Sequence, residues 1–572
     1  MKRYFIILLS LWVVFTLGAC SKIRIEQARV LTQAEIDAHN GTHGEDPDNP
    51  DNPDNPDNPD NPDNPDNPDN PGIPELDDYY VSVTGAGKKD GSSVADAMDL
   101  TTFKDYVRKE EGAASDEKVN VLDGVTFHFA PGTYPMWDAE HPDGLTLGFT
   151  GASKVVKMTF EGASGTIFTG SGQYRILVVS NQIRLILKNI ALSNGYTTTH
   201  GGAIYASACS LFMQDCIVSE NKSAGTESKN GNNGAGIYLA GSVTSASFKG
   251  CMFSENRIET TSTDQYGGAV RIESAQEAND VEFENCIFTG NFAKQAPCIS
   301  VNAKTRLKIN RCTFSGNSAN SRGMIQMAGG TVFLNRSVFY GNRTTDNGGW
   351  GVVLHGKGHI CANNCTIYGN TNASTTEGNN NVSVNGYHSL LMTNCTVIES
   401  CQLGLLRIDD AAGKQVLCNN ILINTSGKTV LIGNTSARTV SAGHNAMSPV
   451  IGFDPFVAHA TDLTNCTEDS FASHAVQDNL FTWQGPLAGF TAATQEDVTR
   501  AMTADFDIEL SGVMSGIGQA FYDWLDEMSP KGYAVDGRGA ARSGVWWPGA
   551  YQGDGQTIPD DSLVDMDPII IH

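Results

Sequence analysis

Two adjacent carboxylates and one histidine are the side chains of this sequence that could carry out acid–base chemistry together. Asp409 is followed directly by Asp410, and His444 stands between Gly443 and Asn445. Two carboxyl groups act as general acid and base on a glycosidic bond when they lie roughly 5 to 9.5 Å apart and one has a raised pKa. The competing interpretation, which we favour, is a solvated acidic pair at a turn. The sequence contains no nucleophile elbow, phosphate-binding loop or dinucleotide fingerprint.

Three isolated aromatic residues could bind a ligand by a different chemistry. Tyr266, Trp350 and Tyr387 stand in segments that are rich in Asn, Ser, Thr and Gly. Loops on a rigid scaffold often carry function, and aromatic faces beside amide donors suit sugar rings. The competing interpretation is that each ring only packs on the surface of its scaffold.

A short segment that begins with Cys and ends with Asn recurs through the middle of the chain. Successive copies start 25 to 35 residues apart, and one of them begins with Ser337 in place of the Cys. A fixed core with variable spacing is typical of a solenoid whose loops differ in length. The Cys column comprises Cys216, Cys251, Cys286, Cys312, Cys365 and Cys395, and the Asn column comprises Asn221, Asn256, Asn291, Asn317, Asn342 and Asn370.

The apolar pattern around the Cys column predicts the type of solenoid. Apolar residues stand five and three positions before the Cys, and again at the Cys and two positions after it, which is the period of strands. The change of phase requires a corner, and residues that tolerate left-handed backbone, such as Asp215, Gly250 and Asn285, directly precede the Cys. Helix-period segments are missing here. We therefore expect an all-β fold, a parallel β-helix, with the Cys and Asn columns as structural ladders.

The Cys column is expected to be an interior stack of free thiols that act as small apolar residues. Stacked Cβ vectors run parallel and stay too far apart for good disulfide geometry. No paired Cys-x-x-Cys spacing and no His cluster is present, so we predict no metal site.

Composition excludes several classes of protein. The 572 residues carry 38 basic and 64 acidic side chains, a formal charge of −26. This balance argues against nucleic acid as a partner and against electrostatic docking to anionic lipid. Hydrophobic residues make up 40% of the chain, which is ample for a core. After residue 19 there is no apolar run of the ~20 residues that a spanning helix needs.

The N-terminus resembles the export signal of a bacterial lipoprotein. A basic start and an apolar run lead to Leu17-Gly18-Ala19-Cys20, which is similar to a lipobox. The resemblance implies that residues 1–19 are a signal peptide and that Cys20 carries lipid. Ser21 follows Cys20, which favours the outer membrane and leaves open which of its two faces carries the protein. The membrane, through this anchor, is thus one expected partner.

A spacer is expected to follow the anchor. Residues 20–46 form a tether, and residues 47–72 contain Asp-Asn-Pro eight times over. Proline fixes φ and pushes the preceding residue to extended geometry, so the repeat should be a semi-rigid stalk. At about 3.1 Å per residue it would reach on the order of 70 Å.

Short motifs in the body resemble the repeats of polymorphic outer membrane proteins, which are β-helical and often adhesins. They are Gly201-Gly-Ala-Ile204, Gly234-Ala-Gly-Ile237 and Gly267-Gly-Ala-Val270, each near a Phe-x-x-Asn segment or a variant of it. The start, Tyr79-Tyr-Val-Ser-Val-Thr-Gly85 with Ala130-Pro-Gly-Thr-Tyr134, is similar to bacterial right-handed β-helix proteins. Asp536-Gly-Arg538 with Pro548-Gly-Ala-Tyr551 resembles their closing segment. The resemblance implies a right-handed, pectate-lyase-like solenoid.

The expected boundaries follow from these patterns. Residues 73–118 form an N-terminal cap with a helix over 99–108, and residues 119–455 form the β-helix. Residues 456–530 interrupt the repeat as an insertion or cap subdomain, with a helix over 520–528 and with Trp483 and Trp524 in a core. Residues 531–572 are the closing segment.

We expect a stalked surface for binding, either adhesion to a host or neighbour-cell surface protein or capture of glycans, without catalysis. The alternative is a polysaccharide lyase or glycoside hydrolase that acts on acidic polysaccharide through Asp409, Asp410 and His444. Only that alternative implies a cofactor, calcium. A purely structural envelope component is a third possibility. Acidic residues aligned across neighbouring coils would favour the enzyme, whereas an aromatic, carboxylate-poor face would favour binding.

Overall fold

The computed structural model describes residues 75–108, 116–225, 233–241, 243, 245–259, 265–273, 280–302, 305–345, 351–372, 382–386, 388–408, 414–433, 438–449, 458–467, 470, 490–506, 516–542 and 546–550. The chain divides into the units Met1–Asn70 and Pro71–His572, and all described residues belong to the second. Cys20, Trp350, Tyr387, Asp409 and Asp410 lie outside the described residues, as do Trp483 and the spacer repeat.

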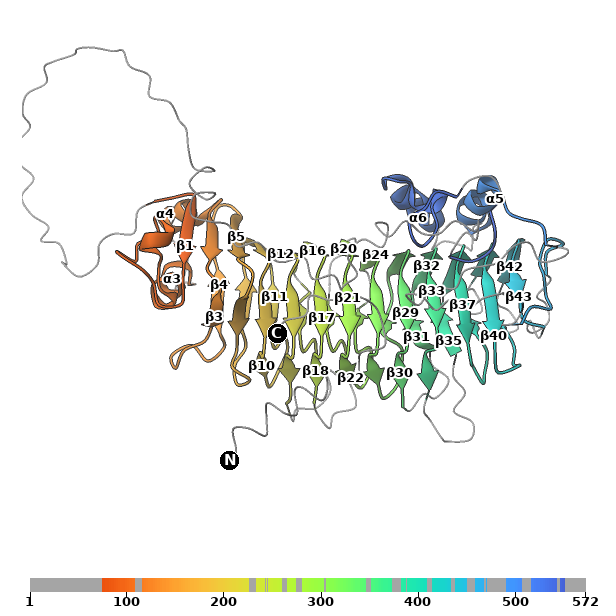
Figure 1. Cartoon of the computed structure of the whole chain (residues 1–572), viewed down its shortest axis with the longest axis horizontal. Helices are drawn as coiled ribbons and strands as arrows, with labels where there is room; N and C mark the ends of the chain where they lie inside the picture. Colours follow the sequence, from red (N-terminus) through yellow and green to blue (C-terminus); the bar gives the residue numbers. More distant parts are fainter. Residues whose placement is uncertain are drawn as a thin grey trace, which may run out of the picture. The chain divides into compact units, whose positions relative to one another are not determined.

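The second unit is a right-handed parallel β-helix whose coils are stacked side by side (Figure 1). A complete coil passes through four parallel sheets, which we number in their order along such a coil, for example β11, β12, β13 and β14. Sheet 1 comprises β4 (Leu145–Gly148), β7 (Leu177–Ser180), β11 (Ile204–Ser207), β15 (Ile237–Leu239), β19 (Val270–Ile272), β23 (Ile299–Val301), β27 (Ile325–Met327), β31 (Gly351–Gly356), β35 (Val382–Gly386), β38 (Leu406–Ile408) and β41 (Leu431–Gly433). Sheet 2 comprises β1 (Asp78–Val81), β2 (Thr126–Phe129), β5 (Val156–Gly162), β8 (Ile183–Lys188), β12 (Ser210–Gln214), β16 (Ser245–Lys249), β20 (Asp280–Glu284), β24 (Arg306–Asn310), β28 (Thr331–Asn335), β32 (His359–Asn363), β36 (Ser389–Thr393), β39 (Lys414–Cys418) and β42 (Arg438–Gly443).

The other two sheets complete the coil. Sheet 3 comprises β3 (Gly132–Pro135), β6 (Thr166–Thr169), β9 (Ala191–Ser193), β13 (Ile217–Ser219), β17 (Met252–Ser254), β21 (Ile287–Thr289), β25 (Thr313–Ser315), β29 (Val338–Tyr340), β33 (Thr366–Tyr368), β37 (Thr396–Glu399), β40 (Ile421–Asn424) and β43 (Ala446–Met447). Sheet 4 comprises β10 (Tyr196–Thr197), β14 (Lys222–Ser223), β18 (Arg257–Ile258), β22 (Phe292–Ala293), β26 (Ser318–Ala319), β30 (Arg343–Thr344) and β34 (Thr371–Asn372). The parallel β-helix that the sequence predicts is thus confirmed.

The predicted corner between two strands is the turn from sheet 2 to sheet 3. Asp215, Gly250 and Asn285 all have positive φ there, at 52°, 62° and 53°. Backbone in this region turns the chain sharply within one residue, and Gly, Asn and Asp tolerate it best. A second left-handed position precedes each member of the Asn column, for example Glu220 (φ 56°) and Gly290 (φ 65°), and makes the turn into sheet 4.

The Cys column lies inside the first of these corners. All six of its cysteines are buried and free, and Ser337 occupies the same position between Cys312 and Cys365. The thiol of Cys286 donates to the carbonyl oxygen of Phe248 at 3.3 Å. Burial raises the pKa of this thiol well above its ordinary value, so it behaves as the small apolar side chain of the prediction.

The Asn column forms a continuous hydrogen-bonded ladder at the second corner. Asn291 donates from Nδ2 to Phe253 O at 2.8 Å and to Asn317 Oδ1 at 3.0 Å. Its own Oδ1 accepts from the backbone N and from Nδ2 of Asn256, at 3.1 and 3.0 Å. The ladder ends at Asn370, whose amide donates to the buried carboxyl of Glu399 at 2.8 Å. Each rung satisfies polar backbone groups that the turn would otherwise leave buried and unpaired.

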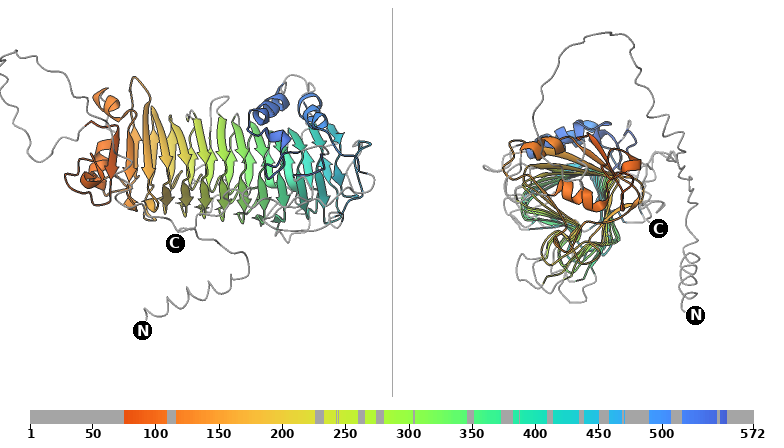
Figure 2. Two further views of the ribbon diagram at one scale, coloured as in Figure 1. Left: turned by 45° about the horizontal axis from the view of Figure 1, so that its top comes forward. Right: turned by 90° about the vertical axis from the view of Figure 1, so that its left-hand side faces the viewer.

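A helical cap covers the N-terminal end of the solenoid (Figure 2). It contains η1 (Val94–Asp96), α3 (Leu100–Val107) and α4 (Asp116–Leu122), and the side chain of Asp99 caps α3 as the sequence indicates. Phe103 of α3 packs edge-on against Phe127 and Phe129 of β2, with ring centroids 5.2 and 4.9 Å apart. The cap therefore covers apolar side chains and the edge of the first coil, which would otherwise attract another strand.

The C-terminal helices fold back onto the outer face of sheet 2 (Figure 1). They are α5 (Gln495–Arg500), the π-helical turn η3 (Ala501–Asp505), α6 (Ile517–Asp526) and η4 (Gly532–Ala534). Phe521 and Trp524 of α6 pack on Phe333 of β28, with ring centroids 5.1 and 5.9 Å apart. Beyond them, Arg542 donates to Asn364 Oδ1 at 2.9 Å. None of the described helices is long and apolar enough to cross a membrane.

Candidate functional site

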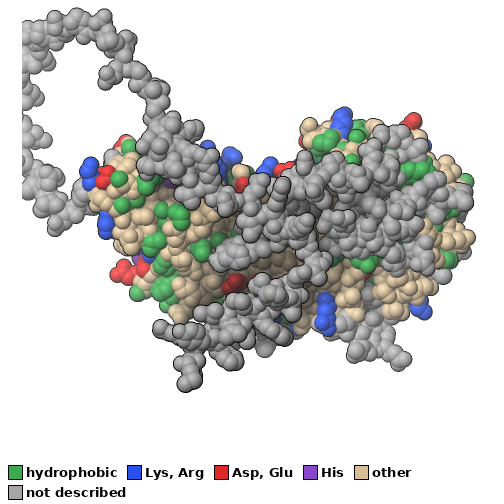
Figure 3. All heavy atoms as spheres, viewed as in Figure 1, with side chains coloured by type: hydrophobic (Ala, Val, Ile, Leu, Met, Phe, Trp, Pro, Cys, Tyr) green, Lys and Arg blue, Asp and Glu red, His purple; other side chains and the backbone are tan. Residues whose placement is uncertain are grey.

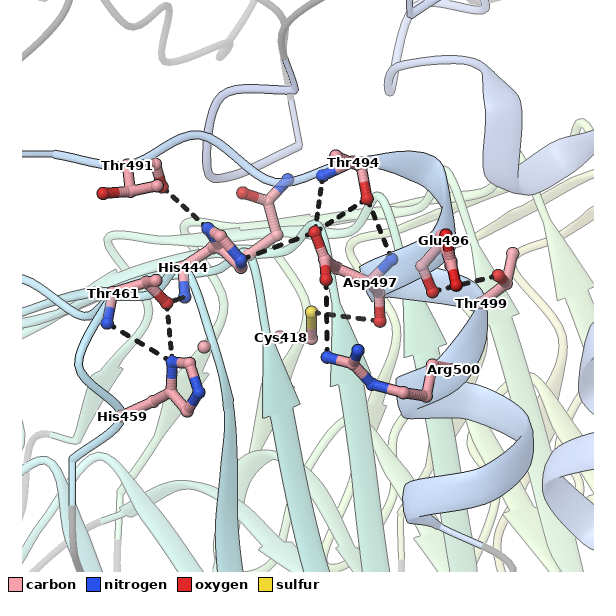
Figure 4. A network of polar contacts seen from close by, with 12 residues as sticks. Cys418, His444, His459, Thr461, Thr491, Thr494, Glu496, Asp497, Thr499 and Arg500 are labelled. Atoms are coloured by element: carbon pink, nitrogen blue, oxygen red, sulfur yellow. Dashed lines mark hydrogen bonds and ion pairs between the residues drawn. The ribbon is translucent and has the colours of Figure 1, made fainter.

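His444 lies under the folded-back segment, in the polar network of Figure 4. It follows β42 directly, and its side chain is 8% exposed. Its Nδ1 donates to the carbonyl oxygen of Thr491 at 2.7 Å, and its Nε2 lies 3.6 Å from the carboxylate of Asp497. Asp497 also accepts from the backbone N of Thr494 at 2.9 Å, within the capping box of α5. His444 thus connects the last coil to α5.

The electrostatics of this network fit a structural role. Burial would raise the pKa of Asp497, but the hydrogen bonds from Thr494 and the charges of His444 and Arg500 outweigh it and hold the pKa below its usual value. An ionised, hydrogen-bonded carboxylate is a poor general acid at neutral pH. Asp409 and Asp410 lie outside the described residues, so a joint site of these two carboxylates with His444 stays a prediction from the sequence.

Two acidic residues on the open part of sheet 2 are engaged in ion pairs. Asp280 contacts Arg306 at 2.7 Å and Lys308 at 3.0 Å, and Glu284 contacts Lys249 at 3.1 Å. Although burial acts to raise the pKa of Asp280, its two basic partners lower it. On the face shown in Figure 3, acidic side chains of the described residues are scattered singly. The described residues also contain no group of three His, Cys, Asp or Glu side chains that could hold a metal ion.

The outer face of sheet 1 stands between the two sets of variable loops. One set leads from sheet 4 into sheet 1 and contains Tyr266 and Trp350, which precede β19 and β31 in the sequence. The other leads from sheet 1 to sheet 2 and contains Tyr387 and the Asp409-Asp410 pair, which follow β35 and β38. The candidate residues Tyr266, Trp350, Tyr387, Asp409 and Asp410 therefore all stand close in sequence to a strand of sheet 1.

Aromatic side chains are stacked on the N-terminal part of this face. Tyr205 and Tyr238 are direct partners in β11 and β15, and their rings are stacked with centroids 5.5 Å apart at 13°. The ring of His200 also stacks on Tyr238, with centroids 4.2 Å apart at 12°. Burial, together with Arg175 and Arg271, lowers the pKa of His200 despite the opposing charge of Glu273, so its ring is neutral at pH 7.

Buried Arg175 fixes the turn that carries His200. It donates from Nε to Gly201 O at 2.9 Å and from Nη2 to His200 O and the Thr197 hydroxyl, both at 3.0 Å. Gly201, at the start of that turn, has φ of +67°, and a Cβ there would clash with the carbonyl oxygen of Ile204. The first glycine of the Gly-Gly-Ala-Ile motif is therefore needed for close backbone packing.

Tyr266 is brought to the same face. The guanidinium of Arg271 lies over the Tyr266 ring, 5.1 Å from its centroid, which is a cation–π contact. Arg271 is the register partner of Tyr238 and donates to Glu273 Oε1 at 2.7 Å and to the Ser300 hydroxyl at 2.5 Å. Of the three aromatic residues that the sequence singles out, Tyr266 is the one that lies within the described part, and it belongs to this cluster.

Sequence reasoning missed the residues that form the floor of the cluster. Tyr205, Tyr238 and Arg271 each stand one position after a Gly-Gly-Ala-Ile-type motif. The motif ends on a residue that points inward, so the next residue must point outward from sheet 1. Reading one position past each motif would have found all three.

Comparison with known proteins shows no matching family model and no similar curated protein. Among solved structures, the pectate lyase Pel9A is similar with a TM-score of 0.35 and 13% identity, over 74% of this chain and 89% of that chain. PfbA, a surface adhesin of Streptococcus pneumoniae, is similar with a TM-score of 0.28 and 10% identity, over 63% of this chain and 93% of that chain. These similarities concern the β-solenoid architecture alone.

Proposed function

We propose that this chain is a lipid-anchored surface protein that binds glycans on the outer face of sheet 1, without catalysis. The observation that carries the proposal is the stack of His200, Tyr238 and Tyr205 in neighbouring coils. Arg271 and Tyr266 continue the stack toward the next coil. These residues share one face, bordered on both sides by variable loops.

The chemistry of this face suits sugars better than hydrolysis. Aromatic rings offer large, rigid surfaces on which the apolar face of a sugar ring can pack, while a few placed polar groups fix its orientation. Arg271, Ser300 and the neutral imidazole of His200 supply such groups. In the described part of the cluster, Glu273 is the sole carboxylate among them, and Arg271 pairs with it at 2.7 Å. A general acid–base pair would need a second carboxylate.

The N-terminal sequence supports presentation of this face at a membrane. A lipidated Cys20 would anchor the chain firmly, because several acyl chains hold far better than one. The spacer at residues 47–72 would then separate the solenoid from the bilayer. Cys20→Ser should release the protein from the membrane fraction, and a variant that stays there would contradict lipid anchoring.

The test uses the chain from residue 20 with Cys20→Ser, so that no lipid is present. We expect it to bind at least one class on an array of neutral and acidic polysaccharides. Tyr205→Ala should weaken that binding about tenfold, because a lost aromatic contact is worth about 1 kcal/mol or somewhat more. Tyr340→Ala is the matched control, since Tyr340 is a half-buried tyrosine on sheet 3.

Three results would overturn the proposal. The first is absence of binding across the whole array. The second is equal loss of binding in the Tyr205 and Tyr340 variants, which would show that the contact lies elsewhere. The third is release of new reducing ends or unsaturated uronides from any polysaccharide, which would replace binding with catalysis.

A further inference from the structure

An aromatic pair outside the cluster described above lies closer to the N-terminal cap. Trp137 and Tyr174 stand in the segments that lead into β4 and β7, and their ring centroids are 4.1 Å apart at 31°. Both side chains are half-buried, and the indole Nε1 of Trp137 donates to the Ser171 hydroxyl at 3.1 Å. The pair therefore offers a partly exposed aromatic surface to which the proposed function assigns no role.

The N-terminal cap holds Trp137 in place. The buried amine of Lys104 in α3 donates to the carbonyl oxygen of Trp137 at 3.1 Å and to the carboxylate of Asp138 at 3.3 Å. Arg108, directly after α3, donates to the same carboxylate at 2.7 Å. Because its backbone is fixed in this way, Trp137 would lose little conformational freedom on contact with a ligand.

Arg175 connects this pair to the aromatic cluster on sheet 1. It follows Tyr174 directly in the chain, and its guanidinium lies 5.7 Å from the centroid of the Tyr205 ring. Val178 of β7 is the register partner of Tyr205, and it stands four residues after Tyr174. Four residues span at most about 14 Å, so the pair adjoins the cluster.

Aromatic side chains thus occur in five successive coils. Trp137, Tyr174 and Tyr266 precede β4, β7 and β19, while Tyr205 and Tyr238 belong to β11 and β15. These strands are neighbours in sheet 1, in the order β4, β7, β11, β15, β19. Since parallel strands stack at about 4.8 Å, the four steps between them span roughly 19 Å along the solenoid axis. A ligand that contacts all of these side chains must be an extended chain.

The charged groups around the pair offset one another. Asp138 contacts Arg108 at 2.7 Å and Lys104 at 3.3 Å. Although burial acts to raise the pKa of Asp138, the hydrogen bonds from its partners hold it well below its usual value. Arg175 pairs with Asp143 at 3.3 Å. Because these charges are paired and the whole chain carries −26, this surface suits a neutral glycan better than a polyanion, which the net charge repels.

We propose that Trp137 and Tyr174 form a second sugar-binding subsite, and that the ligand is a long, neutral polysaccharide which lies along the solenoid axis. This inference rests on the proposed function, because the aromatic cluster on sheet 1 binds other sugar residues of the same chain. The apolar face of one sugar packs on the Trp137–Tyr174 surface, with the Ser171 hydroxyl beside it. Two linked subsites act at a high effective concentration, so affinity rises with the length of the polysaccharide.

The experiment uses the chain from residue 20 with Cys20→Ser. It is titrated with short and long oligosaccharides, of about two and about eight sugars, from glucan, mannan, xylan and polygalacturonate. We expect a long neutral oligosaccharide to bind roughly tenfold or more tightly than the short one of the same glycan, with little dependence on salt. Binding should also change the tryptophan fluorescence, and Trp137→Phe should remove most of that change while an aromatic ring stays in place.

Further variants separate the two subsites. Trp137→Ala and Tyr174→Ala should each weaken the long neutral oligosaccharide about tenfold, because each removes an aromatic contact. The short oligosaccharide should lose no more than about twofold, since the cluster on sheet 1 can still bind it. Tyr340→Ala is the matched control, because Tyr340 is a half-buried aromatic residue on sheet 3. If an alanine variant fails to fold, the fluorescence of Trp137→Phe still tests the subsite.

The results distinguish failure of this inference from failure of the proposed function. If Tyr205→Ala weakens binding while Trp137→Ala and Tyr174→Ala leave it unchanged, the second subsite is wrong and the face on sheet 1 remains. A fluorescence change that persists in full in Trp137→Phe would contradict the subsite as well. The inference also fails if long oligosaccharides bind no more tightly than short ones, or if polygalacturonate binds more tightly than every neutral glycan. If the Trp137 and Tyr174 variants lose binding and Tyr205→Ala does not, the cluster on sheet 1 is wrong instead.

Discussion

Replacement of Glu399 by glutamine should stabilise the protein at neutral and alkaline pH. Glu399 is buried at the end of the Asn ladder, where its Oε1 accepts from the backbone N and the Nδ2 of Asn370, at 3.2 and 2.8 Å. Burial raises its pKa from 4.5 to about 8, although both hydrogen bonds act to lower it. The amide of the Glu399→Gln variant would keep an oxygen acceptor for Asn370 and carry no charge.

The sign and size of the effect follow from the two pKa values. Below pH 4.5 the carboxyl is neutral in both the folded and the unfolded chain, so it costs the fold nothing. Between pH 4.5 and 8 the unfolded chain loses the proton and the folded chain keeps it, so stability falls as pH rises. Each pKa unit is worth about 1.4 kcal/mol, so the loss of stability is about 3 kcal/mol at pH 7 and about 4 kcal/mol at pH 8, where the folded carboxyl is half ionised.

The assay compares urea unfolding of the wild-type chain and Glu399→Gln at pH 5, 6, 7 and 8. The difference in unfolding free energy between them isolates this carboxyl from other titrating groups. It should be small at pH 5 and grow steadily in favour of the variant. Glu255→Gln is the matched control, because Glu255 holds the same position in its own coil but is exposed. It reports what the same substitution does to the unfolding free energy at an exposed site.

A difference for Glu399→Gln that stays constant from pH 5 to 8 would refute the reasoning. A variant that is less stable than wild type at every pH would do so as well, since it would show that Asn370 needs the carboxylate. Either result would mean that the ladder ends in a charge-stabilised contact.

Two further predictions concern the interior columns. Asn291→Ala removes four hydrogen bonds and leaves the backbone N of Asn256 buried without its acceptor. The substitution should therefore lower the free energy of unfolding by about 3 kcal/mol, measured by urea unfolding. A loss below about 1 kcal/mol would show that the ladder is not a source of stability. The twelve described cysteines are buried thiols, and burial raises the pKa of Cys209, for example, to about 12. A charged thiol reagent should label none of them in the native protein and all of them in denaturant, whereas rapid native labelling would contradict a closed interior.

The sequence predicts sheets 2 and 3 and the corner between them because these features leave a readable pattern. Their strands in the repeat region are mostly three to five residues long, enough for alternation to be visible, and the corner repeatedly uses Gly, Asn or Asp. Sheet 4 escaped prediction because its strands have two residues each, such as β14 (Lys222–Ser223). Two residues cannot display a period of two.

The folded-back C-terminal segment was harder to predict, although one signal for it is present. Strand β28 contains Val332, Phe333 and Leu334 in succession, and β36 contains Leu390, Leu391 and Met392. Continuous apolar strands indicate a sheet that is covered on both faces. The cover itself is α6, whose Phe521 and Trp524 lie nearly two hundred positions from Phe333 in the chain. Local patterns do not specify such a pairing.

The candidate site was half predictable for a related reason. Loop composition drew attention to Tyr266, since an aromatic residue among Asn, Ser and Gly is conspicuous. Tyr238 and Arg271 lie in three-residue strands, where they look like ordinary members of a sheet. Only the register shows that they are neighbours and that Arg271 reaches back over the Tyr266 ring. A binding face on a solenoid is built across coils, so its residues share a register position and not a stretch of sequence. Variation in the bordering loops can therefore change the ligand while the residues of the sheet beneath it stay the same.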